Sequence, residues 1–471
     1  MTSDDDTPSI EYCSATDVRR SLSSLLPNLV PYWTRRLGDY AGFVYGIEAF
    51  RSENEVRLHA MDRLRHCIER AALKSGFNTD QAVSAGADVV AAPVIQTGPH
   101  ALLLVEPDAF YTHLFSLLGL LAHGRRWHIT YSVSTSAFRE SAKKGPGWLP
   151  LEGEALNVFG LPRKRLVGTS IACENGPYRY ALSNSRGQTA PSASARRLLD
   201  ILPKAEFRTG AEAIKMGNQA LWQELFAAPV NRLQLDDFDM ADLIADHLED
   251  SASWLSAHFV GGTGAALAVL QEIDRLNAGP WAGWIRRTTD LFWGLGKDRV
   301  FPLYLNDGVL RSARSPGLEV SFTPECLAQA LRDRTILPGM FMSYLVTAIL
   351  PGVRVLGGCR QTVYLPLMRH LAAVGFDVAG DREFPLTLKD DERPGVWGHR
   401  VLKPVDGRPL QEIEAAGGIL PLLTKYADLT LEDASGNLSS FTRDPIWAAM
   451  SANIASGSIT PKSREWQWSG L

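Results

Sequence analysis

Two apolar stretches of the chain are each followed by a polar, glycine-bearing loop and then by an apolar helical pattern. The first stretch covers residues 89–95 and leads into the loop 96–100; the second covers residues 353–356 and leads into the loop 357–361. Continuous apolar runs of this kind are typical of strands buried on both faces, as in parallel sheets. The repeated order therefore predicts two neighbouring strands of one mainly parallel sheet.

Further strand patterns lie at residues 127–133, 232–235 and 300–305, where aromatic and β-branched residues are frequent. A helical pattern fills most of residues 16–76, with apolar positions recurring at three- and four-residue steps. The first strand, the helix after it and the strand at 127–133 together match the length of a right-handed βαβ crossover. A crossover of this kind is the building unit of a parallel sheet.

These patterns divide the chain into five segments. We predict a helical N-terminal segment (1–78), the first part of an α/β core (79–190), a mainly helical insertion (191–298), the second part of the core (299–375) and a C-terminal loop-rich extension (376–471). The predicted fold class is α/β, with a Rossmann-like, mainly parallel sheet.

Composition and charge narrow the class of function. The chain of 471 residues carries a formal net charge of −4, which gives no general attraction to nucleic acid or to anionic membranes. No apolar run reaches the roughly 18 residues of a bilayer-spanning helix. We therefore expect a small-molecule ligand and neither a nucleic-acid nor a membrane partner. The helix around residues 61–71 packs on the core or, alternatively, forms a homodimer contact.

The five cysteines are scattered and show no C-x-x-C spacing. This pattern suggests neither a zinc site nor a disulfide framework, so we predict no metal and a reducing, cytoplasmic location. The acidic amino terminus lacks the basic-then-apolar order of a signal peptide. The sequence does not identify a cofactor.

The first loop carries Thr97, Gly98 and His100, and Tyr111 and His113 follow on the predicted helix. Loops at the carboxyl ends of parallel strands are where open α/β sheets bind ligands. Glycine can adopt positive φ, amides at a helix start can hold an anion, and an imidazole can transfer a proton near neutral pH. We predict a substrate-binding loop with His100 as a catalytic residue; the alternative is an ordinary turn with a surface histidine.

The second loop, Gly357-Gly358-Cys359-Arg360-Gln361, has the same position relative to its strand. Its arginine can grip a carboxylate or phosphate with two hydrogen bonds. Its cysteine lies near a predicted helix start, where a lowered pKa would make it a nucleophile; the alternative is a buried, inert thiol. We predict that all five residues contribute to the site, with Arg360 as the anion-binding group and Cys359 as a second catalytic candidate.

Carboxylates cluster after the short strand at 232–235. Asp236 comes directly after this strand, and Asp239, Asp242, Asp246 and Asp250 then recur at three- and four-residue spacing. Acidic residues in the first turn stabilise a helix, so a solvated acidic helix face is the simplest interpretation. A divalent-metal site is the alternative. Asp236 is included among the substrate-binding candidates.

The two loops resemble short motifs of the bacillithiol-biosynthesis cysteine ligases. Residues 97–100, with 110–112, are similar to that family's Thr-Gly-Gln-Gln and Pro-x-Tyr-Thr motifs, and residues 357–365 to its Gly-Pro-Gly-Glu-x-x-Tyr segment. The resemblance implies a Rossmann-like core and the joining of cysteine to a glucosamine–malate conjugate. The family's Glu-Asp-His-Asp run is replaced here by Ser-Val-Ser-Thr at 132–135, so the resemblance supports a shared fold rather than a shared substrate. Ser134 in this stretch is a further substrate-binding candidate.

Familiar catalytic signatures are absent from the sequence, including G-x-S-x-G, H-E-x-x-H, a complete P-loop and G-x-G-x-x-G after a strand. The leading hypothesis is a cytoplasmic biosynthetic enzyme with a ligase-like condensation, joining or transferring an amino acid or thiol co-substrate to a small anionic metabolite. One alternative is a glycosyl- or other group transferase with a nucleotide-activated donor. Another is a non-catalytic protein that binds a metabolite or a partner protein.

Overall fold

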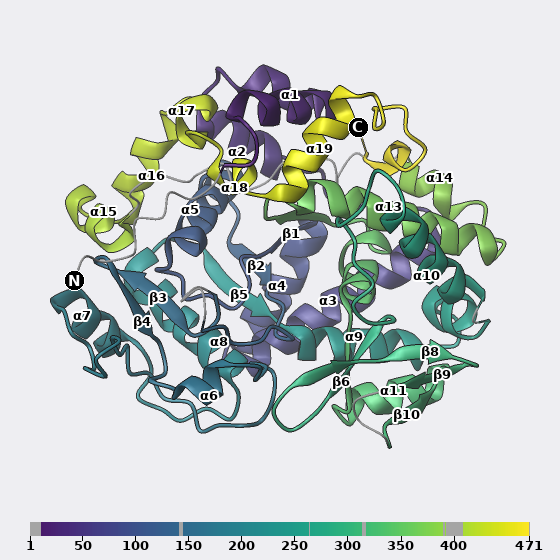
Figure 1. Ribbon diagram of the computed structural model, residues 1–471, viewed down its shortest axis with the longest axis horizontal. Helices are drawn as coiled ribbons and strands as arrows, with labels where there is room; N and C mark the ends of the chain where they lie inside the picture. The colour runs from purple at the N-terminus through teal and green to yellow at the C-terminus, as the bar shows by residue number, and fades with distance from the viewer. Residues whose placement is uncertain are drawn as a thin grey trace.

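A computed structural model describes residues 11–140, 145–262, 264–312, 317–389, 391 and 408–470. The protein is a mixed α/β structure in which helices surround a central four-stranded parallel sheet (Figure 1). The sheet consists of β1 (Val94–Thr97), β2 (Trp127–Tyr131), β5 (Asn231–Leu235) and β12 (Arg354–Gly357).

The spatial order of these strands is β12-β1-β2-β5, and every neighbouring pair is parallel. The predicted pairing of the two glycine-loop strands is confirmed, because β1 and β12 lie side by side with Thr97 opposite Gly357. From β1 the chain continues to β2 and β5 on one side and returns to β12 on the other. The strand order therefore changes direction between β1 and β12, and both glycine loops leave the sheet at this point.

The N-terminal segment is helical, as predicted. Its elements are α1 (Ala15–Leu25), η1 (Pro27–Tyr32), α2 (Leu37–Tyr45) and α3 (Glu55–Lys74), followed by α4 (Thr79–Ala91). Val89 and Val90 belong to the last turn of α4, so the prediction that the first strand begins at residue 89 is wrong. A short apolar run does not distinguish the end of a buried helix from a strand.

Helices cover both faces of the sheet. The crossover from β1 to β2 runs through α5 (Pro107–Ala122), which confirms the predicted βαβ unit. On one face the indole nitrogen of Trp127 donates to Ser84 of α4 at 3.1 Å. On the other, Nδ1 of His113 in α5 lies 2.9 Å from Nε2 of His128. Successive residues of β2 therefore face different helices, as the period of a strand requires.

The face of the sheet under α5 is unusually polar for a buried surface. It carries Gln96, His128, Thr130, Arg232 and Gln234, all buried and drawn from three neighbouring strands. These side chains bond to one another and to α5; for example, Arg232 donates to Gln234 at 2.7 Å. Buried polar groups need such partners, since an unpaired one costs about 1–3 kcal/mol. The strands are thus buried on both faces, but only the opposite face is predominantly apolar.

Segment 191–298 was expected to be a helical insertion, yet it supplies β5 to the central sheet and is therefore part of the core. The helices of this segment are α7 (Ala193–Ile201), α8 (Gly210–Leu221), η2 (Trp222–Phe226), α9 (Asp237–Leu248), η3 (Leu255–Val260) and α10 (Gly264–Asn277). The short helix α6 (Arg163–Leu166) precedes the segment. The predicted short strand near residues 232–235 is confirmed.

Small antiparallel sheets lie at the edges of the molecule. They are formed by β3 (Trp148–Leu151) with β4 (Glu154–Asn157), by β6 (Phe292–Leu295), β7 (Val300–Pro302) and β11 (Ile336–Pro338), and by β8 (Tyr304–Asn306), β9 (Val309–Arg311) and β10 (Glu319–Ser321). The strand pattern at 300–305 is thus real, but its strands belong to these sheets and not to the parallel one. Of the described residues in segment 299–375, only those of β12 join the central sheet.

The remaining helices come from the last third of the chain. They are α11 (Pro324–Arg332), α12 (Met340–Tyr344), η4 (Leu345–Ile349), α13 (Gln361–Val378), α14 (Phe384–Lys389), α15 (Pro409–Ala416), α16 (Ile419–Ala427), α17 (Leu431–Ser435), α18 (Ser439–Thr442), α19 (Pro445–Ala455) and η6 (Trp466–Trp468). The C-terminal extension is therefore largely helical where it is described, not loop-rich. Figure 1 shows α19 beside α1, so the two terminal regions pack together.

The acidic face of α9 is not solvated, contrary to expectation. Asp242 pairs with Lys74 of α3 at 2.9 Å and with Arg334 at 2.6 Å, and Asp246 pairs with Arg332 of α11 at 2.6 Å. The acidic residues of α9 therefore form an ion-pair seam between α3 and α11. Among the described residues no group of three or more histidine, cysteine or acidic side chains could hold a metal ion, so the metal alternative gains no support.

The contact between α2 and α5 depends on a glycine. A methyl group added to Gly119 of α5 would lie 2.1 Å from the ring of Tyr45 and 2.7 Å from the carbonyl oxygen of Ala41. Gly119→Ala is expected to reduce the free energy of unfolding by about 1–3 kcal/mol, because overpacking forces the helices apart. Gly42→Ala in α2 is the matched control: its methyl group meets only Ala122, at 3.9 Å. Urea unfolding of both variants tests this, and equal stabilities would contradict it.

Candidate functional site

A cavity of about 430 Å³ lies at the carboxyl ends of the parallel strands. Each strand supplies a lining residue in the loop that follows it or at its end: His100 after β1, Tyr131 in β2, Asp237 after β5 and Arg360 after β12. The prediction that His100 and Arg360 face one cleft is confirmed. The walls are largely apolar and are formed by Leu270, Ile273, Trp284, Ile285, Leu291, Trp293, Met340, Phe341 and Met368.

His100 is held in one tautomer by the backbone. Its Nδ1 accepts a hydrogen bond from the amide of Val133 at 3.1 Å. An amide N–H can only donate, so Nδ1 carries no proton and Nε2 carries it in the neutral ring. In the neutral ring, His100 can therefore donate a hydrogen bond through Nε2. A role as a proton acceptor, which the sequence had left open, would require the opposite tautomer.

Asp237 is the buried carboxylate of the cavity, and it is not among the residues predicted from the sequence. Its Oδ1 accepts from the hydroxyl of Tyr131 at 2.5 Å, and its Oδ2 accepts from the amides of Ser134 and Thr135, both at 2.8 Å. Burial raises the pKa of the Asp237 carboxyl above its ordinary value, while these hydrogen bonds oppose the shift. A carboxylate with a raised pKa in a cavity is suited to act as a general base.

Asp237 could have been found by counting along the strand. Side chains alternate between the two faces of a sheet, and Leu235 lies opposite Tyr131 in register. Position 237 has the same parity as Leu235 and faces the cavity with Tyr131. Asp236 has the opposite parity; it caps α9 and accepts from Lys215 at 3.1 Å.

Arg360 is already paired within the protein. Its Nε and Nη2 donate to the two carboxylate oxygens of Asp444 at 2.6 and 2.8 Å, and Asp444 in turn caps α19. This two-point contact orients the guanidinium but uses the edge that would grip a ligand carboxylate. Nη1 is the group of Arg360 with no such contact to Asp444, so a ligand anion would meet it there.

The two glycine loops are joined by hydrogen bonds beneath the cavity. Thr97 donates to Oε1 of Gln361 at 2.7 Å, and the hydroxyl of Tyr344 donates to Thr97 at 3.0 Å. A methyl group on Gly357 would lie 1.1 Å from Oε1 of Gln361, so glycine is needed there for this crossing. Thr97, Gly357 and Gln361 therefore hold the loops together, and Tyr364, which contacts Tyr344, lines the cavity above them.

Other predicted site residues have structural contacts elsewhere. The hydroxyl of Tyr111 donates to Glu412 of α15, and His113 faces the polar side of the sheet beside His128. The thiol of Cys359 donates to the carbonyl oxygen of Ser440 at 3.1 Å. None of these three side chains lines the cavity. Ser134 contributes indirectly, because it holds Asp237.

The first loop does not place a helix start at the site. Gly98 has the expected positive φ, +106°, but α5 begins only at Pro107. The side chain of Glu106 caps this helix and accepts from the amide of Ala109 at 3.1 Å. A carboxylate therefore already occupies the position where an anion was expected to bind. Gly358 lies in the loop before α13. The amide of Gln361, the first residue of α13, donates to the carbonyl oxygen of Gly358 at 2.9 Å.

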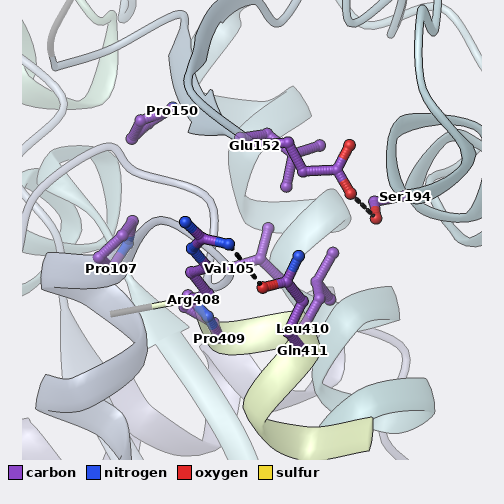
Figure 2. Close-up of a pocket in the computed structure, with 10 residues that line it drawn as sticks. Val105, Pro107, Pro150, Glu152, Ser194, Arg408, Pro409, Leu410 and Gln411 are labelled. Atoms are coloured by element: carbon purple, nitrogen blue, oxygen red, sulfur yellow. Dashed lines mark hydrogen bonds between the residues drawn. The ribbon is translucent and has the colours of Figure 1, made fainter. Parts of the chain in front are cut away.

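A second, much smaller cavity of about 50 Å³ lies between the β3–β4 hairpin and the start of α5 (Figure 2). Its polar side chains form two pairs, which Figure 2 marks with dashed lines. Ser194 donates to Glu152 at 2.5 Å, and Arg408 donates to Gln411 at 3.4 Å. This volume holds one or two water molecules. The cavity is therefore too small to be the main ligand site.

No family model matches the chain, and comparison with curated proteins found no match. No helix in the described part of the chain has the length and apolar character needed to cross a membrane. The function must therefore be argued from the cavity itself.

Cys359→Ser is expected to leave ligand binding and turnover within about twofold of the original protein. The thiol donates to a backbone carbonyl, and a hydroxyl of similar volume can make the same contact. Ligand titration and steady-state kinetics test this. A loss of turnover by orders of magnitude with binding preserved would instead identify Cys359 as a nucleophile.

Proposed function

We propose that this chain is a cytoplasmic biosynthetic enzyme that joins or transfers an amine- or thiol-bearing metabolite to a small anionic substrate. One observation carries the proposal: all four parallel strands deliver a polar side chain to a single cavity with apolar walls. Cavities of this size and composition, at the carboxyl ends of strands, are the usual place for small-molecule chemistry in α/β proteins.

The strand order supports a Rossmann-like core as part of the proposal. Numbered along the chain, the sheet reads 3-2-1-4 from β5 to β12, which is the first part of the Rossmann order. The cavity lies beside the point where this order changes direction. The same two loops carry the resemblance to the bacillithiol-biosynthesis ligases.

In the proposed reaction Asp237 takes the proton of the incoming amine or thiol. The N–H or S–H bond breaks, its proton passes to the carboxylate, and the freed electron pair forms the new bond to a carbonyl carbon of the acceptor while the π pair of the C=O bond moves to the oxygen. When the C=O bond re-forms, the bond from this carbon to the activating group of the acceptor, such as a phosphate, breaks, and the leaving group departs with that electron pair and takes up the proton held by Asp237. Nε2–H of His100 donates to the oxygen on which negative charge develops. Nη1 of Arg360 holds the anionic group of the acceptor. The apolar walls exclude water and hold the substrate body.

A thermal-shift screen tests the proposal. Amino acids, thiols and small carboxylates or phosphates are offered singly and in pairs, with nucleotide sugars as a separate panel. One-site binding at a hundredfold excess over Kd stabilises by about 2.7 kcal/mol. Stabilisation by an amine or thiol together with a small anion supports the proposal. A response confined to nucleotide sugars favours the transferase, and no response in any panel favours a protein-binding role.

Two variants then assign any response to this cavity. Asp237→Asn and Arg360→Gln should each reduce it, because they change groups that line the cavity. Arg196→Gln is the matched control, since Arg196 is exposed and lines a different surface groove. A ligand response that survives both cavity variants would contradict the site.

A further inference from the structure

Two sets of elements build the cavity at the strand ends, and they differ in chemistry. The ends of the parallel strands and the loops after them supply the polar lining groups His100, Tyr131, Asp237 and Arg360. Helices α10, α12 and α13, strand β6 and the residues beside them supply the apolar walls. A ligand that fills the cavity therefore needs a polar end and an apolar body.

The walls offer few hydrogen-bonding groups in the described part of the chain. The polar side chains that they add are Arg286, Thr288, Thr289 and Tyr364. The hydroxyl of Thr289 is used by the backbone, because it accepts from the amide of Leu303 at 3.0 Å and donates to the carbonyl oxygen of Phe292. Arg286 and Thr288 are exposed. A ligand hydroxyl placed against the apolar walls would thus lose its hydrogen bonds to water, which costs roughly tenfold or more in affinity.

The apolar walls are held in place by contacts outside the cavity. The ring of Trp284 packs edge-on against Trp447 of α19, with 5.2 Å between the ring centres. The side chain of Asn277 donates to the carbonyl oxygen of Ile285 at 2.5 Å and accepts from the amide of Gly283 at 3.2 Å. A ligand would not have to order this loop, so apolar contact with it is not offset by an ordering cost.

The volume of the cavity limits the size of the ligand. An apolar cavity of about 150 Å³ holds one benzene molecule, and this cavity has about 430 Å³. It therefore has room for roughly 15 non-hydrogen atoms. An acid of up to about ten non-hydrogen atoms leaves space for a small amine or thiol beside it.

We propose that the acceptor of this site is an apolar acyl group. Its aliphatic or aryl chain, of about six to ten carbons, lies against the walls, and its acid or activating phosphate meets Nη1 of Arg360. The buried carboxylate of Asp237 repels an anion and so favours this orientation. A sugar or malate body carries polar groups along its length and does not match the walls. This inference rests on the function proposed above and specifies its acceptor.

Isothermal titration of the full chain with straight-chain carboxylates tests the inference. Acetate, butyrate, hexanoate, octanoate and decanoate form the series, and 3-phenylpropionate represents an aryl chain. Affinity should rise about fourfold for each added methylene until the cavity is filled, and then level off or fall. Malate and glucose 6-phosphate, the polar comparison, should bind more weakly than octanoate. Equal affinity from acetate to octanoate, or tighter binding of either polar anion, would overturn the inference.

A polar substitution in the wall locates the chain of the acid. Met340 lines the cavity and is 38% exposed, so Met340→Gln changes its polarity at similar length with little effect on folding. Octanoate should bind about three- to tenfold more weakly, and acetate as before. Met216→Gln is the matched control, because Met216 of α8 is 37% exposed and is not among the lining residues. Equal losses of octanoate affinity in the two variants would contradict the assignment.

Two further variants separate the chain of the acid from its head. Trp293→Leu enlarges the cavity, so the tightest-binding acid should become longer, a change that a loss of folding does not produce. Arg360→Gln should weaken all the acids by roughly tenfold to a hundredfold and leave the increase per methylene unchanged. If neither Met340→Gln nor Trp293→Leu altered the dependence on chain length, the acids would bind elsewhere and the inference would fail.

The same ligands distinguish this inference from the proposed function. A thermal shift that needs an amine or thiol together with octanoate supports both. A shift that needs an amine or thiol together with malate or glucose 6-phosphate, and not with octanoate, would keep the proposed function and overturn the apolar acceptor. Chain-length-dependent binding of the acids with no effect of any amine or thiol would support the apolar acid site and overturn the condensation.

Discussion

Asp237→Asn is expected to lower turnover by about 10²–10⁴-fold while the protein remains folded, the usual contribution of a positioned general base. Asparagine keeps a carbonyl oxygen for the amides of Ser134 and Thr135, which Asp237 now accepts at 2.8 Å each. Its NH₂ group can face the Tyr131 hydroxyl, which can reverse from donor to acceptor. The amide cannot take a proton from the substrate, so kcat should fall far more than binding. Steady-state kinetics with the pair of ligands found by thermal shift measures this.

Two controls bracket this result. Tyr131→Phe removes one hydrogen bond from Asp237 but leaves the carboxylate, so its effect on turnover should be smaller than that of Asp237→Asn. Asp200→Asn changes an exposed carboxylate in the groove beside α7 and should behave like the original protein. Turnover by Asp237→Asn within tenfold of the original would remove Asp237 from the proton transfer.

The parallel sheet was predictable because its signals are local and repeated. An apolar run, a glycine loop and an apolar helix occur at both β1 and β12, and the two strands are neighbours. The start of β1 was not predictable, since residues 89–95 are apolar throughout and their helical half is fixed by packing of α4 on α3. Hydrophobicity alone does not separate the end of a helix from the start of a strand.

The acidic helix shows a different limit. Regular spacing of Asp242 and Asp246 predicted an acidic face of α9, but not what lies against it. Lys74 pairs with Asp242 from 168 positions away, and Arg332 pairs with Asp246 from 86 positions away. Each of the two basic residues lies on a separate helix. Only the tertiary arrangement brings the two charge patterns together. The sequence pattern therefore predicts a solvated acidic face, whereas the structure shows that these carboxylates form an ion-pair seam.

The site was predicted at the level of loops and less well at the level of side chains. The switch-point rule correctly brought His100 and Arg360 to one cavity. It did not distinguish Asp236 from Asp237, although the alternation of side chains along β5 does so. It also did not indicate that Asp444 pairs with Arg360. The partner of Arg360 comes from the N-cap of α19, far along the chain, and no local pattern marks it.

The largest expected effect on stability is at a buried cluster of charged side chains that includes Arg369 of α13, the helix after the second glycine loop. Asp391 lies between Arg57 of α3 and Arg369 of α13, at 3.3 and 3.2 Å, and the three residues are 6%, 4% and 2% exposed. Asp391→Asn removes the buried carboxylate that pairs with both guanidinium groups. We expect the free energy of unfolding to fall by about 3–5 kcal/mol, the usual cost of breaking a buried ion pair from one side. Urea unfolding followed by circular dichroism measures it.

Arg57 and an exposed ion pair provide the controls for this prediction. Adding Arg57→Met to Asp391→Asn should recover part of the lost stability, because one of the two buried guanidinium groups that paired with Asp391 is removed and the thioether fills the space of the aliphatic stem. Asp428→Asn breaks only the exposed pair with Arg36 and should have little effect, since water and salt screen such pairs. If Asp391→Asn were no more destabilising than Asp428→Asn, the charges of Arg57 and Arg369 would have to be solvated rather than neutralised by Asp391. If the double variant were less stable than Asp391→Asn, Arg57 would stabilise the fold through its packing over Phe384, 5.6 Å from the ring centre, more than through its charge.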